Sequence, residues 1–133
     1  MTQKKRVFLS FRGEDRQQVN GLRLLAANPD FDLEFYDESV QTPYDSTNAA
    51  YIKQKISEKI NRTSVTVCLI GKETYTSAWV NWELQTSVDK GNTLIAMALK
   101  GVDEAILPSL IRAKNLPFHP WDAARLHDLI VGN

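Results

Sequence analysis

Residues Ser64–Ile70 read Ser-Val-Thr-Val-Cys-Leu-Ile and end at Gly71, and this stretch decides the fold. The run is apolar and rich in β-branched side chains, so it predicts a strand. A strand with almost no polar positions is typical of the middle of a parallel sheet, where helices cover both faces. Thr93–Leu99 has the same character and predicts a second buried strand of this kind.

Helical patterns separate these strands from one another and from the other predicted strands. Three segments have apolar residues at helical spacing: Glu14 to about Ala27, about Thr47 to Asn61, and Ser77 to about Lys90. Three further segments predict strands: Val7–Phe11, Phe31–Tyr36, and Leu116–Phe118, which contains a proline and therefore suits an edge. Asp122 is the expected N-cap of a last helix that runs through Ile130.

Strands and helices alternate along the chain, so we expect an α/β protein with a parallel sheet and helices on both faces. Right-handed crossovers and about five strands favour a flavodoxin-like three-layer fold with strand order 2-1-3-4-5. The 133 residues are enough for one domain, 1–133, and not for two. In such sheets ligands bind at the carboxyl ends of the strands, near the first and third strands. Residues 11–15, 37–46 and 71–79 should lie there.

Charge and composition exclude several classes of partner. The chain has 16 basic and 16 acidic residues, so it lacks the basic footprint of a protein that binds nucleic acid or an anionic membrane. Cys68 is the single cysteine and cannot form an internal disulfide, which favours a reducing compartment. The sequence shows no signal-peptide pattern and no apolar stretch of membrane-spanning length. We therefore expect a cytoplasmic location and no membrane partner.

Several common site motifs are absent from the sequence. There is no Gly-rich dinucleotide fingerprint, no phosphate-binding loop with lysine and no serine nucleophile elbow. His119 and His127 have no cysteine nearby and do not predict a metal site. The third predicted strand ends in Ile70-Gly71-Lys72 and lacks the aspartate that a phosphoacceptor receiver domain requires.

Trp79 and Glu83 form the pair of residues that points to a site. They are four positions apart, so they lie one turn apart on the same face of the predicted helix. An aromatic plate beside a carboxylate can hold a sugar or a nucleotide against an acid. The structural alternative is that Trp79 packs in the core and Glu83 is a solvated acid near the helix start.

A family resemblance covers about Arg6 to Leu99. Val7–Asp15, which reads VFLSFRGED, resembles the first signature box of plant-type TIR domains. Ser64–Leu84 resembles the TIR segment of third strand, loop and helix, in which a tryptophan precedes the catalytic glutamate by four residues. The whole chain is similar to short TIR-like proteins of bacterial Thoeris-type antiphage systems, especially in Asn61–Gly71 and Asp89–Asn92. The loop 37–46 lacks the basic-glycine pattern of plant and animal TIR domains.

The resemblance implies an NAD+ glycohydrolase or ADP-ribosyl cyclase that cleaves the nicotinamide–ribose bond in antiphage immunity. NAD+ is then the substrate, and no cofactor is needed. Glu83 takes the catalytic role and stabilises the oxocarbenium-like ribose, while Trp79 forms the wall that fixes ribose or nicotinamide. The Thoeris likeness favours a cyclic ADP-ribose signal that activates a separate effector. It also implies a homo-oligomer formed through TIR–TIR contacts.

Four further residues are candidate substrate-binding positions. Phe11 and Arg12 lie at the switch point of the sheet, where Arg12 can reach a phosphate. Asp37 and Ser46 lie on the flanking loop, where they can bond the ribose or close over the pocket. Each has a structural alternative: packing for Phe11, an ion pair with Asp37 or Glu83 for Arg12, and turn formation for Asp37 and Ser46.

Two other functions compete with the enzyme. The first is a non-catalytic TIR adaptor or scaffold that acts through TIR–TIR contacts, and the Asp37–Ser46 loop would then carry its assembly surface. The second is a flavodoxin-like cofactor binder, which lacks support because no flavin-type loop is present.

Overall fold

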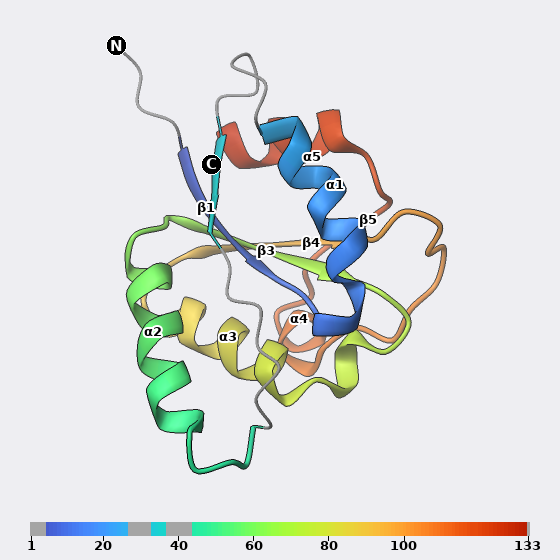
Figure 1. Cartoon of the computed structure of the whole chain (residues 1–133). Helices are drawn as coiled ribbons and strands as arrows, with labels where there is room; N and C mark the ends of the chain where they lie inside the picture. The colour runs from blue at the N-terminus through green and yellow to red at the C-terminus, as the bar shows by residue number, and fades with distance from the viewer. Residues whose placement is uncertain (1–4, 27–32, 37–43, 133) are drawn as a thin grey trace.

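The computed structural model describes residues 5–26, 33–36 and 44–132. Five strands within these ranges form one sheet, and every neighbouring pair is parallel (Figure 1). The strands are β1 (Lys5–Ser10), β2 (Leu33–Tyr36), β3 (Val65–Ile70), β4 (Thr93–Ala98) and β5 (Phe118–His119). Their order is β2-β1-β3-β4-β5, which is the predicted order of an α/β parallel sheet.

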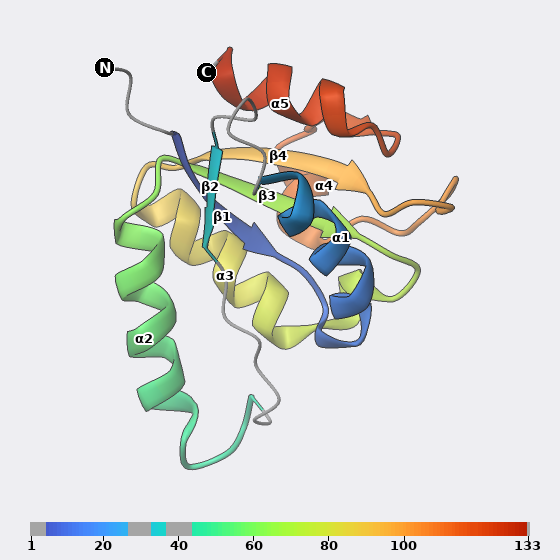
Figure 2. The ribbon, with the colours of Figure 1, turned by 45° about the horizontal axis from the view of Figure 1, so that its top comes forward.

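Helices cover both faces of the sheet, as predicted. The described helices are η1 (Gly13–Asp15), α1 (Arg16–Ala26), α2 (Ala49–Asn61), η3 (Thr74–Thr76), α3 (Ala78–Asp89), α4 (Ser109–Ala113) and α5 (Ala123–Val131). α1 and α5 lie on one face, and α2, α3 and α4 lie on the other (Figures 1 and 2). Among these helices, none combines the length and the apolar character needed to cross a membrane.

Alternation along β1 divides its side chains between the two faces. Val7 and Leu9 belong to the buried cluster under α1 and α5, while Phe8 packs with Ile56 and Ile60 of α2. Ser10 is two positions after Phe8 and therefore faces the α2/α3 side as well. A hydroxyl at the end of a central strand is thus placed under the helix that carries the candidate site.

β3 is buried along its whole length, as the continuous apolar run predicts. It pairs with β1 from Val7↔Val65 to Ser10↔Cys68 and with β4 along its full length. Ser10 at the end of β1 therefore lies beside Cys68, two residues before the end of β3.

The last third of the chain fits the sequence prediction in part. The edge strand is Phe118–His119 and not Leu116–Phe118, since Pro117 has no N–H for the sheet and pairing with β4 begins after it. Asp122 caps α5 as expected, because its Oδ1 accepts a hydrogen bond from the Arg125 N–H at 3.1 Å.

Burial predicts that the Cys68 thiol is unreactive in the native protein. The side chain is fully buried, and burial, followed by the nearby Glu83, raises the pKa of the Cys68 thiol. Since thiolates are the reactive species, iodoacetamide at mildly alkaline pH should leave native Cys68 unmodified. The same reagent should label the protein fully in denaturant, as mass spectrometry would measure. Rapid labelling of the native protein would contradict this burial.

Candidate functional site

The start of α3 is fixed by Ser77, which is its N-cap. Ser77 Oγ accepts a hydrogen bond from the Val80 N–H at 3.2 Å, so the helix begins at Ala78. Its end at Asp89 precedes Gly91, which has a positive φ of 87° and suits glycine. The predicted helix from Ser77 to about Lys90 is therefore confirmed, and Glu83 lies in its second turn.

Glu83 is buried against the carboxyl end of β1. Only 4% of the residue is exposed, so it is not a solvated helix acid. Ser10 Oγ donates a hydrogen bond to Glu83 Oε1 at 2.8 Å, and Ser10 itself is fully buried. A carboxylate held by a charge-assisted hydrogen bond in a buried setting keeps one orientation. The alternative of a surface carboxylate is thus excluded for Glu83.

A second polar contact joins α3 to the sheet one turn further along. Thr66 Oγ1 donates to Ser87 Oγ at 2.7 Å, and both residues are fully buried. Asn92 Nδ2 donates to the same Thr66 oxygen at 3.1 Å. Glu83 and Ser87 are four residues apart, so both contacts lie on the helix face that rests on β1 and β3.

Trp79 of α3 lies on the side of the sheet that α2 and α3 cover, beside the aromatic rings of Trp82 and Tyr44. Its ring meets Trp82 edge-on with centroids 6.1 Å apart, and Tyr44 edge-on at 5.1 Å. Trp79 and Trp82 both pack against the cluster around Phe8, which for Trp79 agrees with its structural alternative. Lys53 Nζ lies 4.2 Å from the centroid of the Tyr44 ring, which adds a cation–π contact.

The flanking loop is described only from Tyr44 onward. Asp37 lies outside the described residues, so its predicted role stays a prediction. Ser46 Oγ is buried and makes no hydrogen bond with the part of the chain that the structure describes, while the Ser46 carbonyl accepts from the Ala49 N–H at 3.2 Å ahead of α2. Because Tyr44 contacts Trp79, this end of the loop lies beside the start of α3.

The structure does not bring Phe11 to the Glu83 side of the sheet. Phe11 is 8% exposed and packs in the cluster that α1 and α5 cover, so the geometry favours its packing alternative. Arg12 makes ion pairs with Glu14 at 3.3 Å and Glu73 at 3.4 Å, and not with the predicted partner Glu83. The difference arises because Glu14 is a near neighbour in sequence and Glu73 follows the adjacent strand.

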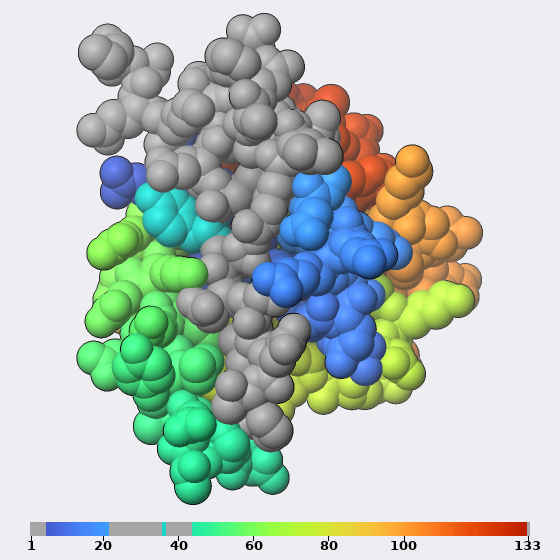
Figure 3. Space-filling view, viewed as in Figure 1, coloured from blue at the N-terminus to red at the C-terminus, as the bar shows by residue number. Residues whose placement is uncertain are grey.

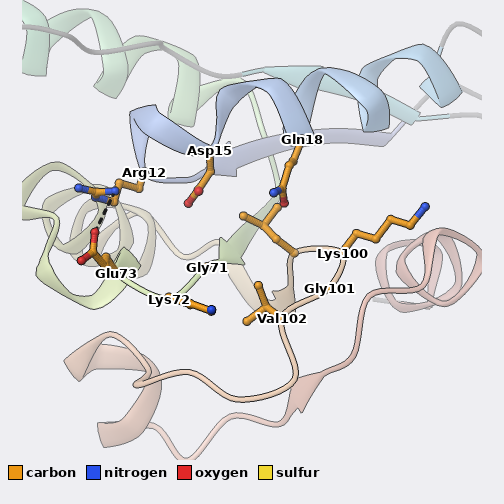
Figure 4. Close-up of a pocket in the computed structure, with 10 residues that line it drawn as sticks. Arg12, Asp15, Gln18, Gly71, Lys72, Glu73, Lys100, Gly101 and Val102 are labelled. Carbon is orange, nitrogen blue, oxygen red and sulfur yellow. Dashed lines mark ion pairs between the residues drawn. The ribbon is translucent and has the colours of Figure 1, made fainter.

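A polar pocket of about 440 Å³ lies where the loops after β1, β3 and β4 meet (Figure 4). Figure 3 shows the loops after β3 and β4 beside the start of α1 at one edge of the molecule. The lining residues are Arg12, Asp15, Gln18, Gly71, Lys72, Glu73, Leu99, Lys100, Gly101 and Val102. Glu83 is not among them, so the two polar regions of this sheet edge are separate.

Asp15 is the carboxylate of this pocket, and it closely approaches Gly71. A Cβ at Gly71 would lie 2.9 Å from Asp15 Oδ2, so a larger residue there would displace the carboxylate. Burial raises the pKa of the Asp15 carboxyl. The Arg12 guanidinium opposes this effect, and Glu14 and Glu73 add to it.

Known proteins resemble this chain in sequence and in fold. The family described as "Thoeris protein ThsB, TIR-like domain" matches residues 8–104, which include the end of β1 and the whole of α3 and β4. The chain belongs to this family. The matched part of this Thoeris TIR-like domain contains Ser10, Trp79 and Glu83.

A relative from Bacillus cereus (strain MSX-D12) is named "Putative cyclic ADP-D-ribose synthase ThsB1". It is 32% identical over an alignment of 103 residues, which covers 70% of this chain and 50% of the relative. The Thoeris TIR-like domain described here therefore spans about half the length of that relative.

Two solved structures share the fold. The TIR domain of the Toll-related receptor TRR-2 from Hydra magnipapillata superimposes with a TM-score of 0.62 at 13% identity, over 96% of this chain and 92% of that one. A 2-deoxyribosyltransferase from Bacillus psychrosaccharolyticus also gives 0.62, at 15% identity, over 92% and 90%. A receptor domain and an enzyme share this architecture, so the fold by itself does not decide the activity.

Ser10 is the residue of the site that the sequence prediction missed. The sequence predicts only a strand residue at this position, yet the Ser10 hydroxyl contacts a residue 73 positions away. The period of two could have found it, because Ser10 is the polar member of the Phe8 face of β1.

Replacement of Ser10 by alanine should destabilise the Thoeris TIR-like domain by about 1–3 kcal/mol, because buried Glu83 loses a donor. Denaturant unfolding monitored by tryptophan fluorescence would measure the change. Ser64→Ala is the matched control, since Ser64 is exposed and precedes β3. Equal stability of the two variants would show that the Ser10–Glu83 hydrogen bond adds nothing to the fold.

Proposed function

We propose that this chain cleaves the nicotinamide–ribose bond of NAD+ and forms a cyclic ADP-ribose product in Thoeris-type antiphage defence. The observation that carries the proposal is the buried Glu83 carboxylate, oriented by Ser10 at the carboxyl end of β1 and one turn from Trp79. Membership of the ThsB family and the name of the Bacillus cereus relative support the substrate and the product.

The chemistry requires few protein groups. The C1′–N bond to nicotinamide breaks, and its electron pair goes to the ring nitrogen, which leaves neutral because nicotinamide in NAD+ is already cationic. No general acid is therefore needed. Positive charge develops on the ribose, and a fixed carboxylate nearby stabilises it. Glu83 takes this role, and its burial strengthens the interaction because little water screens it.

The second half of the reaction decides the product. If water attacks C1′ and loses a proton, the product is ADP-ribose. If a nucleophile within the ADP part attacks C1′, the product is cyclic and one water lighter. The name of the relative favours the cyclic product.

Trp79 and the start of the flanking loop complete the proposed substrate site. The Trp79 ring provides a wall for ribose or nicotinamide. When substrate binds, Tyr44 either moves away from the Trp79 ring or contacts the substrate together with it. The unpartnered Ser46 hydroxyl can bond a ribose oxygen, as can Asp37. Phe11 and Arg12 remain predicted contacts, with Arg12 assigned to a phosphate. The active form in this proposal is a homo-oligomer, and its product activates a separate effector.

Incubation of concentrated protein with NAD+, followed by chromatography and mass analysis, tests this function. We expect release of nicotinamide together with a product one water lighter than ADP-ribose. A product with the mass of ADP-ribose would show that the protein hydrolyses NAD+ and does not cyclise it. No nicotinamide at concentrations where light scattering detects self-association would instead favour a non-catalytic TIR adaptor.

A further inference from the structure

Apart from Arg12, the residues that line the pocket bordered by Asp15 and Lys72 have no role in the proposed reaction at Glu83. It is built from three loops that follow β1, β3 and β4, so the parallel order of the sheet brings its walls together. Ligands of open α/β sheets bind at this carboxyl edge. Its volume of about 440 Å³ lies within the range of small-molecule sites.

Three polar side chains in this pocket are available to a ligand. Figure 4 shows Asp15 of η1 and Gln18 of α1 pointing toward the loops that carry Lys72 and Val102. The side chains of Asp15, Gln18 and Lys72 make no hydrogen bond or ion pair with any residue that the structure describes. The Arg12–Glu73 ion pair closes one end of the pocket (Figure 4).

The chemical types of these groups define one class of ligand. Lys72 offers an ammonium group to an anion such as phosphate. Asp15 accepts a hydrogen bond from a hydroxyl, and Gln18 can both donate and accept. Val102 is a half-buried apolar surface beside them. Together these groups suit a ligand that carries both a phosphate and a hydroxyl.

We propose that this pocket binds the ribose phosphate unit of a nucleotide, with the phosphate on Lys72 and a ribose hydroxyl on Asp15. Two sources supply this unit. One is a free mononucleotide. The other is NAD+ itself, and this second assignment rests on the proposed function. Apart from Arg12, this site shares no residue with the Glu83 site, so binding can be measured without turnover.

NMR titration of the full chain with AMP and with ribose 5-phosphate tests the site. We expect saturable shifts of the backbone amides of Gly71, Lys72, Gly101 and Val102. Lys72→Gln should weaken AMP binding about tenfold or more, since a charge-assisted hydrogen bond is lost. Lys114→Gln is the matched control, because Lys114 is an exposed lysine that does not line the pocket, and it should leave the affinity unchanged.

The contribution of Asp15 is tested by Asp15→Ala. This variant should bind ribose 5-phosphate more weakly than the wild type but inorganic phosphate equally well, because only the hydroxyl contact is removed. Absence of shifts at the four amides with both ligands would overturn the proposal. Unchanged AMP affinity in Lys72→Gln would also overturn it.

A competition experiment distinguishes the two sources of the ribose phosphate. In Glu83→Gln, which should bind NAD+ without cleaving it, displacement of AMP from these amides by NAD+ identifies the substrate as the occupant. Simultaneous binding identifies a separate mononucleotide. Nicotinamide release is a different readout, so loss of that activity and loss of AMP binding can be told apart.

Discussion

Glu83→Gln is expected to lower nicotinamide release by at least about 10²–10³-fold, because the neutral amide cannot stabilise the positive charge that develops on ribose. Glutamine has the same length, and its Oε1 can still accept the hydrogen bond from Ser10 Oγ, so the fold should be preserved. NAD+ turnover measured by chromatography, with circular dichroism to check folding, would establish the effect.

Glu58→Gln is the matched control for this variant. Glu58 is an exposed glutamate on α2, and its replacement removes the same charge without touching the Ser10–Glu83 contact. The control should retain wild-type turnover. Full activity of Glu83→Gln would remove Glu83 from the mechanism, whatever the control does.

Phe8→Ala is expected to destabilise the protein by about 3–5 kcal/mol, which is the usual effect of removing a large buried aromatic side chain. Phe8 is fully buried between β1 and the residues Ile56 and Ile60 of α2, and Trp79 packs against the same cluster. The cavity would therefore open directly beneath the candidate site. Denaturant unfolding would give the change in free energy.

Tyr51→Ala provides the comparison for this large effect. Tyr51 is also an aromatic residue of this layer, but 59% of it is exposed, so its removal should change stability by no more than about 0.5 kcal/mol. A change below about 1 kcal/mol in Phe8→Ala would contradict the packing described for this face, given the usual cost of such cavities.

The sequence was most informative where local pattern and tertiary position agree. The continuous apolar run of β3 can only be accommodated between two helical layers, and so it predicted the central strand correctly. Ser77 caps the start of α3, and Gly91 follows its end as a local stop signal. The predicted limits of this helix agree with the structure within one residue. The spacing of Trp79 and Glu83 placed both residues on α3, but whether the carboxylate was buried or solvated stayed open.

Long-range contacts account for what could not be predicted. The buried Glu83 carboxylate accepts a hydrogen bond from Ser10. No local sequence pattern links a strand hydroxyl to a helix carboxylate 73 residues away. Arg12 meets Glu73 only because β1 and β3 are adjacent. Alternation with Ser10 places Phe11 on the opposite face of the sheet, which favours its packing alternative, while its contact with substrate stays a prediction.

The two polar contacts beneath α3 also act as a specificity device. Ser10–Glu83 and Thr66–Ser87 join one helix to two adjacent strands, within layers that are otherwise apolar. A slip of either strand by one residue would turn its hydroxyl to the other face, and a rotation of the helix would separate both pairs. Each misplaced buried group would cost about 1–3 kcal/mol. The contact that orients the candidate carboxylate thus also discriminates against misaligned sheets during folding.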